Sequence, residues 1–199
     1  MNKTPVLAAA LAAACAMMLS ACSLPGAAPT LTLHDLGGVF PQGSAKSPVA
    51  LRSVQVIAQP IVATFDMQYR EASQPTRRGK YGLNRWAATP ASMVEAALAR
   101  QLAPQGSGRC RLQYSLGEFI IEVAADGQTR ALLVADAIVL RDAQAGAGGG
   151  SLRQGFDVSV PMREASPAGG AIALREAVIK LAENSASWLS GEPSRFCAG

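Results

Sequence analysis

Apolar and polar residues alternate along several stretches of the chain, which is the pattern of strands that bury one face. Residues 52–58 and 61–70 both show it, and in the second stretch apolar or aromatic side chains occupy every odd-numbered position. Pro60 separates the two stretches, at a point where the missing backbone N–H is expected to interrupt a strand. We therefore expect two strands in this region.

Three longer strands are expected over residues 109–123, 129–141 and 152–160. In the first, the apolar side chains move from even-numbered to odd-numbered positions at Gly117 and Glu118, and such a change of phase predicts a β-bulge. The second is apolar on both faces over residues 132–134, which favours a central place in the sheet beneath a helix. The third alternates regularly, so one of its faces should be in water.

Two helices are expected. Thr89 is a good N-cap and Pro90 suits the first helical position, so a helix should run from there to about Leu102. A final helix is expected over about residues 171–189, ended by Gly191 and Pro193. Its apolar stripe consists of Ala171, Leu174, Val178, Leu181 and Trp188.

Runs of consecutive strands favour antiparallel pairing with helices on one face. The expected fold is α+β: a mainly antiparallel sheet of about five strands with two helices packed on one face, in the order β-β-α-β-β-β-α. Residues 31–34 could add a short edge strand. The polar residues 71–80 are interpreted as a solvated hairpin tip, although Arg77, Arg78 and Lys80 leave open a contact with anionic lipid head groups or an acidic partner.

The N-terminus has the features of a secretory signal. Lys3 precedes an apolar run over residues 6–19, which is too short for a comfortable transmembrane helix. The run ends in Leu19-Ser20-Ala21-Cys22, which resembles the lipobox of bacterial lipoproteins. We expect residues 1–21 to be removed and Cys22 to carry diacylglycerol and an N-acyl chain. A plain signal peptide with an incidental cysteine is the alternative.

This processing would determine the location of the protein. Two or more acyl chains anchor a protein stably to a membrane, whereas one does not. Ser23 follows the cysteine, and by the sorting rule of lipoproteins this favours the outer membrane, facing the periplasm. Residues 22–48 are rich in Pro, Gly, Ala and Ser and are expected to form a flexible tether. Residues 49–199 then form a single domain.

Composition indicates neither an enzyme nor a nucleic-acid binder. A net charge as small as +4 does not indicate a nucleic-acid binder, which would show a concentrated basic face. His34 is the single histidine, expected at the surface without partner metal ligands, so no catalytic triad and no metal site are expected. The run at 146–150 is glycine-rich, but a strand rather than a helix should follow it, so a hairpin is favoured over a phosphate loop. No cofactor is expected besides the lipid on Cys22.

Cys110 and Cys197 are the two cysteines outside the N-terminal region. In the oxidising periplasm we expect them to form a disulfide that ties the final helix to the sheet. Two free thiols or pairing between chains are the alternatives.

Residues 81–90 read Tyr-Gly-Leu-Asn-Arg-Trp-Ala-Ala-Thr-Pro. This segment resembles the signature of the ABC-type transport auxiliary lipoprotein family, also called PqiC-like, whose members have a tyrosine, an Arg-Trp pair and a proline that opens a helix. The resemblance extends over nearly the whole chain after Cys22. It departs mildly at residues 31–33, where members often have a Tyr-x-Leu segment.

The resemblance implies a non-catalytic lipoprotein of an Mce-type system that moves phospholipid between the inner and outer membranes. Its implied partners are a periplasmic Mce-domain protein, which it would dock, the permease and ATPase of the same system, and outer-membrane lipid; a homo-oligomer stays open. Tyr81, Asn84, Arg85 and Trp86 either contact a partner or only position the start of the helix. The alternatives are a periplasmic lipid-binding carrier and a structural lipoprotein of another outer-membrane assembly.

Overall fold

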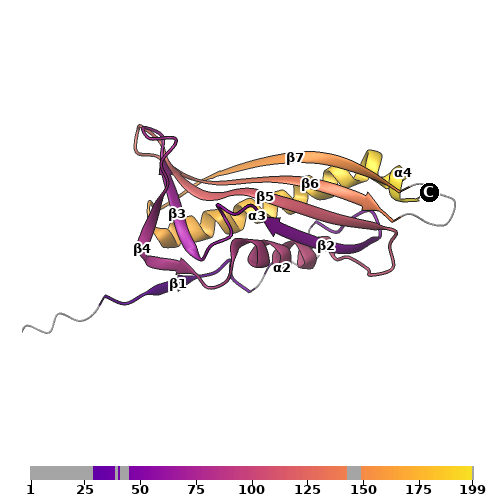
Figure 1. Ribbon diagram of the computed structural model, residues 1–199, viewed down its shortest axis with the longest axis horizontal. Helices are drawn as coiled ribbons and strands as arrows, with labels where there is room; N and C mark the ends of the chain where they lie inside the picture. The colour runs from indigo at the N-terminus through magenta and orange to yellow at the C-terminus, as the bar shows by residue number, and fades with distance from the viewer. Residues whose placement is uncertain (1–28, 39, 41–44, 143–148, 199) are drawn as a thin grey trace, which may run out of the picture. The chain divides into compact units, whose positions relative to one another are not determined.

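Strand β5 (Cys110–Val123) is the centre of the sheet in the computed structural model, which describes residues 29–38, 40, 45–142 and 149–198 (Figure 1). One edge of β5 pairs along its whole length with β6 (Thr129–Arg141) in the antiparallel sense. The other edge is shared by β2 (Leu51–Ala58) and β3 (Asp66–Glu71), which both run parallel to it. The register of β5 against β6 shifts between Leu116 and Glu118, which confirms the predicted bulge.

The remaining strands extend the sheet on both sides. β7 (Gly150–Pro161) pairs antiparallel with β6, so β6 has the expected central place. On the other side β4 (Gly79–Trp86) pairs antiparallel with β3, and β1 (Thr32–His34) pairs parallel with β4. The strand order is β1-β4-β3-β5-β6-β7, with β2 beside the first half of β5.

The expected sheet of about five mainly antiparallel strands with two helices was therefore wrong, although the α+β class is correct. Within the described residues the sheet is mixed, has seven strands and is accompanied by three helices. The strand β4 lies where the sequence indicated only the end of a polar loop and a family-like segment. Three pairings, β1 with β4, β2 with β5 and β3 with β5, are parallel. In each pair at least two other elements separate the strands along the chain, as parallel pairing requires, because a tight hairpin joins only antiparallel strands. Residues 61–65 form turns and bends rather than a strand.

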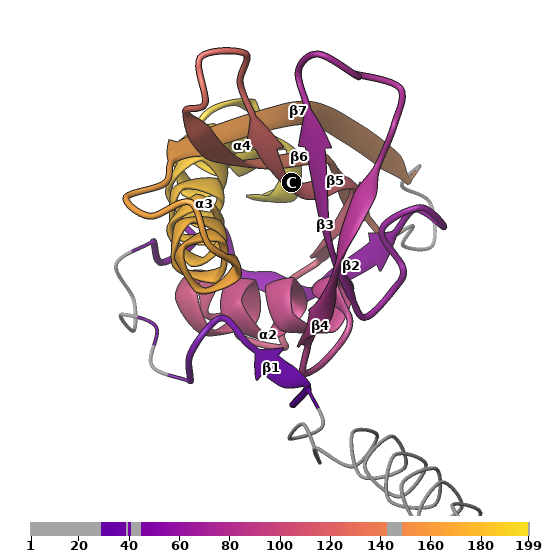
Figure 2. The same cartoon turned by 90° about the vertical axis from the view of Figure 1, so that its left-hand side faces the viewer.

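Helix α2 (Pro90–Leu102) matches its prediction, and the Thr89 side chain accepts a hydrogen bond from the backbone N–H of Ser92. Helix α3 (Pro167–Ser190) begins four residues earlier than expected, because Ser166 provides the N-cap and Pro167 the first turn. Both helices lie on the same side of the sheet (Figure 2). The short helix α4 (Glu192–Ala198) follows Gly191 and was not predicted.

The core lies between the helices and the sheet. Tyr114 of β5 is fully buried and donates a hydrogen bond of 2.7 Å to Ser185 of α3, whose hydroxyl donates in turn to the carbonyl of Leu181. Burial raises the pKa of Tyr114, so its phenol stays protonated and able to donate. Near the start of α3, a Cβ at Gly170 would lie 2.1 Å from the Ile121 side chain, so only glycine permits this approach.

Part of the expected tether belongs to the folded unit. Leu36, Phe40 and Ala45 are buried in the core, and the backbone N–H of Ser47 donates to the carbonyl of Leu102 at the end of α2. The expected signal peptide at 1–21, Cys22 and most of the glycine-rich run at 146–150 lie outside the described residues. Over the part of the chain that is described, we find no helix long and apolar enough to cross a membrane.

The predicted disulfide is present. Cys110 at the start of β5 and Cys197 in α4 are bonded, with their Cα atoms 5.8 Å apart and a sequence separation of 87. The bond ties α4 to the central strand, and the Phe196 ring lies beside the Arg141 guanidinium of β6.

Reduction of this disulfide should destabilise the protein. Because the bond closes a long loop, we expect its loss to lower the unfolding free energy by about 2–4 kcal/mol, or the melting temperature by roughly 4–16 °C. The measurement is a thermal melt with and without reductant. A Cys110→Ala/Cys197→Ala variant is the control and should not respond to reductant; an equal response of both proteins would contradict the prediction.

Candidate functional site

The family-like segment forms β4 and its junction with α2. Trp86, the last residue of β4, is 2% exposed and packs against Phe119, with ring centroids 5.3 Å apart. Tyr81 is partly buried and its ring centroid lies 5.0 Å from that of Tyr69 in β3. Trp86 is therefore a core residue that fixes the approach to α2, and its burial leaves it no surface with which to contact a partner.

Asn84 and Arg85 hold β4 to its neighbours. The Asn84 side-chain oxygen lies 2.8 Å from the Nε2 atom of His34 in β1. His34 is thus partly buried and bonded across the strand pair, rather than free at the surface as the sequence suggested. Arg85 is half exposed, and its Nε atom lies 3.4 Å from an Asp66 carboxylate oxygen. The described residues contain no group of three side chains suited to hold a metal ion.

An ion-pair network covers the opposite face of the same sheet region. Arg70 of β3 contacts Glu122 at 2.6 Å and Glu118 at 3.2 Å, both on β5. Arg78 and Arg130 extend it, with contacts of 2.6 Å to Glu118 and 2.7 Å to Glu122. Ile120 lies between the two glutamates along β5, on the same face of the strand, and is fully buried. Ile120 is thus a buried apolar side chain flanked by the network on the face of the sheet away from the helices.

The charges in the network stabilise one another. Burial alone would raise the pKa of Glu122, but hydrogen bonds from Arg70 and Arg130 outweigh it and hold that pKa below its usual value. The same hydrogen bond from Arg70 to Glu122 raises the pKa of Arg70. Sequence reasoning missed this network, because Arg70 and Glu122 become neighbours only through the parallel register of β3 and β5.

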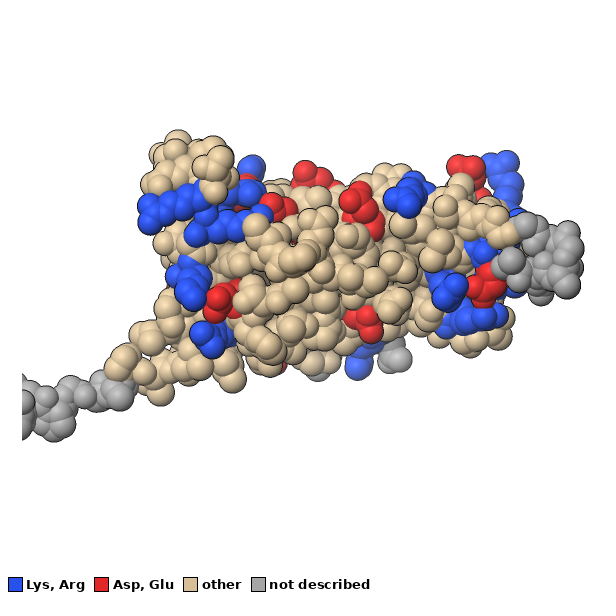
Figure 3. Space-filling model, viewed as in Figure 1, with Lys and Arg blue, Asp and Glu red and all other residues tan. Residues whose placement is uncertain are grey.

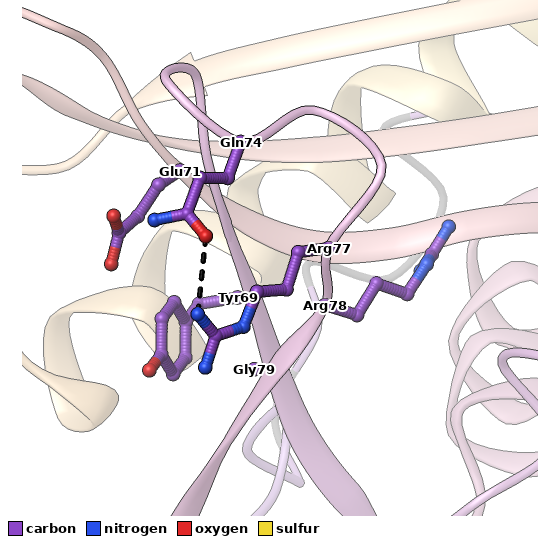
Figure 4. A pocket seen from close by; sticks show the side chains of 6 residues that line it. All are labelled: Tyr69, Glu71, Gln74, Arg77, Arg78 and Gly79. Carbon is purple, nitrogen blue, oxygen red and sulfur yellow. Dashed lines mark hydrogen bonds between the residues drawn. The ribbon is translucent and has the colours of Figure 1, made fainter.

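A small cavity lies at the turn between β3 and β4 (Figure 4). Its volume is about 120 Å³, and its lining residues are Tyr69, Glu71, Gln74, Arg77, Arg78 and Gly79. Arg77 points toward Gln74 and donates to it at 3.1 Å, whereas Arg78 points away toward Glu118. A Cβ at Gly79 would come within 2.3 Å of the Tyr69 ring, so a side chain there would displace this wall of the cavity.

The three basic side chains that the sequence placed in a polar loop, Arg77, Arg78 and Lys80, each make a different contact in the structure. Arg78 belongs to the ion-pair network, Arg77 to the cavity, and Lys80 lies 3.5 Å from the Asp66 carboxylate that Arg85 also approaches. Lys and Arg side chains lie at the end of the protein where β3 and β4 are found, and others lie at the opposite end, with acidic side chains beside them at both ends (Figure 3).

Comparisons with known proteins identify the fold. No family model matches the chain, and no curated protein matches it in sequence. A solved protein from Xanthomonas campestris of the family DUF330 superposes with a TM-score of 0.63 at 18% identity, over 79% of this chain and 93% of that protein. An uncharacterised protein of known structure gives a TM-score of 0.61 at 15% identity, over 80% of this chain and 99% of that one.

A candidate lipoprotein from Caulobacter crescentus, 18% identical over 72% of this chain and 94% of its own, gives a TM-score of 0.38, which is too low to establish a shared fold. At these identities, the first two likenesses establish that the chain shares the fold of the DUF330 protein from Xanthomonas campestris.

The two residues of the Arg-Trp pair should differ in their effect on stability. Trp86→Ala removes a buried aromatic side chain and should lower the unfolding free energy by about 3–5 kcal/mol. Arg85→Ala removes a half-exposed ion pair and should change it by less than about 1 kcal/mol. Denaturant unfolding of both variants tests this, and similar losses in the two would contradict the assignment of Trp86 alone to the core.

The ion-pair network should contribute to stability in its ionised form. Because the pKa of Glu122 is lowered by folding, its contribution is present above the unfolded value of about 4.5 and is lost as pH falls through the lower folded value. Glu122→Gln should cost about 1–3 kcal/mol at neutral pH and flatten the acid side of the stability profile. Glu176→Gln, in an exposed pair with Lys180, is the control. An unchanged acid profile in Glu122→Gln would contradict the prediction.

Proposed function

We propose that this chain is a non-catalytic lipoprotein, anchored by lipid on Cys22 in the outer membrane and facing the periplasm. There it docks the Mce-domain protein of an Mce-type ABC transport system that moves phospholipid between the membranes. The permease and ATPase of that system act at the inner membrane, and this chain provides its fixed end at the outer membrane.

The observation that carries this proposal is the place of the family-like segment in the fold. Residues resembling the PqiC-like signature form β4 and its junction with α2, with Trp86 in the core. The fold around them is shared with a DUF330 protein, and DUF330 is the family of the PqiC-like lipoproteins. Sequence resemblance and shared fold thus support the same family.

The packing between helices and sheet favours docking over carriage of lipid. A carrier needs space for acyl chains, and the layer between α2, α3 and the sheet is filled by fully buried side chains such as Leu98, Leu133 and Tyr114. The cavity at the β3–β4 turn, at about 120 Å³, is too small to enclose an acyl chain and is lined mostly by polar side chains. The larger hollows, of about 250–520 Å³, lie open at the surface and do not enter this layer.

Binding to the Mce-domain protein encoded in the same genome tests the proposal. The full lipidated chain is placed in nanodiscs, and association of the purified Mce-domain protein is measured by surface plasmon resonance. We expect saturable binding that is absent from empty nanodiscs and from nanodiscs with an unrelated lipoprotein.

Equal binding to the unrelated lipoprotein, or none to this chain, would contradict the docking role. A parallel test compares envelope permeability in strains lacking this gene, the Mce gene or both. One shared pathway predicts that the double deletion is no more permeable than either single deletion.

A further inference from the structure

Three leucines are exposed where the sheet ends at β1. Leu31 and Leu33 are 50% and 60% exposed, and Leu83 of β4 is 46% exposed. Leu33 pairs with Arg85 in the parallel register of β1 and β4, so these two side chains share one face. Because side chains alternate along a strand, Leu83, two residues before Arg85 in β4, lies on that same face. Leu31 directly precedes β1. Exposed apolar side chains gathered in this way mark an interaction surface more often than scattered ones do.

Two cations adjoin the leucines. Lys80 and Arg85 have side chains that are 65% and 49% exposed. Both approach the single carboxylate of Asp66, Lys80 at 3.5 Å and Arg85 at 3.4 Å. One carboxylate opposes two cations, so this face, which we call the β1–β4 edge (Leu31, Leu33, Lys80, Leu83 and Arg85), keeps a net positive charge. Figure 3 shows further basic side chains at this end.

The length of the chain restricts what this face can meet. Leu31 follows Cys22 by nine residues. Nine residues span at most about 30 Å when fully extended. If Cys22 carries lipid, as the proposed function holds, Leu31 at the near end of the β1–β4 edge can never be farther than this from the bilayer surface. Such tethering keeps the effective concentration of membrane high, so even weak contacts with it are populated.

We propose that the β1–β4 edge lies against an anionic phospholipid surface. The leucines enter the head-group boundary, where apolar side chains are removed from water. Lys80 and Arg85 bind phosphate groups of the same lipids, because anionic bilayers attract cations close to their surface. This inference rests on the lipid anchor of the proposed function and adds to it an orientation. The end with β1 and β4 faces the membrane, and the faces of β7 and α3 remain free for the Mce-domain protein.

A fluorescent probe at position 33 tests the orientation. The full lipidated chain carries Leu33→Cys, labelled with an environment-sensitive fluorophore; the cysteines at 110 and 197 are bonded to each other and do not react. The matched control is Ile172→Cys, an apolar position on α3 that is 68% exposed. Both proteins are reconstituted into vesicles of phosphatidylethanolamine with phosphatidylglycerol, and into vesicles of phosphatidylcholine alone.

We expect the emission at position 33 to shift to shorter wavelength in the anionic vesicles and to be quenched by a lipid-borne quencher. The emission at position 172 should remain that of a probe in water. Lys80→Glu/Arg85→Glu should reduce the shift at position 33, whereas Arg153→Glu/Lys180→Glu, a charge reversal elsewhere on the surface, should not.

Other outcomes would overturn the proposal. Identical, water-like emission at both positions would show that the edge faces away from the bilayer. A shift that appears only when the density of the protein in the vesicles is raised would indicate a second copy on the edge. A shift only after addition of the Mce-domain protein would indicate that protein instead. If Cys22 is acylated and the Mce-domain protein binds, but the probe at position 33 remains in water, the inference fails and the proposed function stands. A preparation without acyl groups would overturn the proposed function and, with it, the anchor on which this orientation depends.

Discussion

The two edges of β5 determine how the rest of the chain is arranged. One edge is paired along its length by β6, and the other is divided between β2 and β3 at the bulge beside Gly117. Because the bulge changes which side chains point toward the helices, β5 presents Leu112, Tyr114 and Leu116 before it and Phe119 and Ile121 after it. In this way β5 contributes side chains to the main core along its first half and to the region around β3 and β4 along its second half.

The arrangement at the far half of β5 follows from this division. β3 pairs with β5 over only three residues, a short parallel ladder. The ion pairs of Arg70 with Glu118 and Glu122 span the same strand pair and add contacts where the backbone ladder is short. β4 and β1 are attached beyond β3, so the basic and apolar surface at this end depends on the β3–β5 contact. The disulfide secures the opposite end of β5 to α4.

Local signals predicted most of the elements, although β4 and α4 were missed, and non-local pairing accounts for the error in the sheet. The helix cap at Thr89 and Pro90, the bulge at Gly117 and the pairing of Cys110 with Cys197 were all readable, because each depends on neighbouring residues or on a count of cysteines. β4 could not be predicted from the alternation of its side chains. Its pairing with β3 is irregular: Asp66 of β3 pairs with Arg85, but Gln68, two residues later, pairs with Lys80. This shift in register breaks the alternation of inward side chains along β4. Parallel pairing and the Arg70–Glu122 contact leave no local signal in sequence. For the candidate site, the sequence pointed to Arg85 and Trp86 but could not separate the buried ring from the exposed guanidinium.

The central claim is that this fold is held at a membrane by lipid on Cys22, and the most direct measurement is the mass of the N-terminal peptide of the protein isolated from native envelopes. The account predicts a peptide that begins at Cys22 and carries diacylglycerol and an N-acyl chain. A peptide that begins at Met1, or one with an unmodified thiol at position 22, would contradict it.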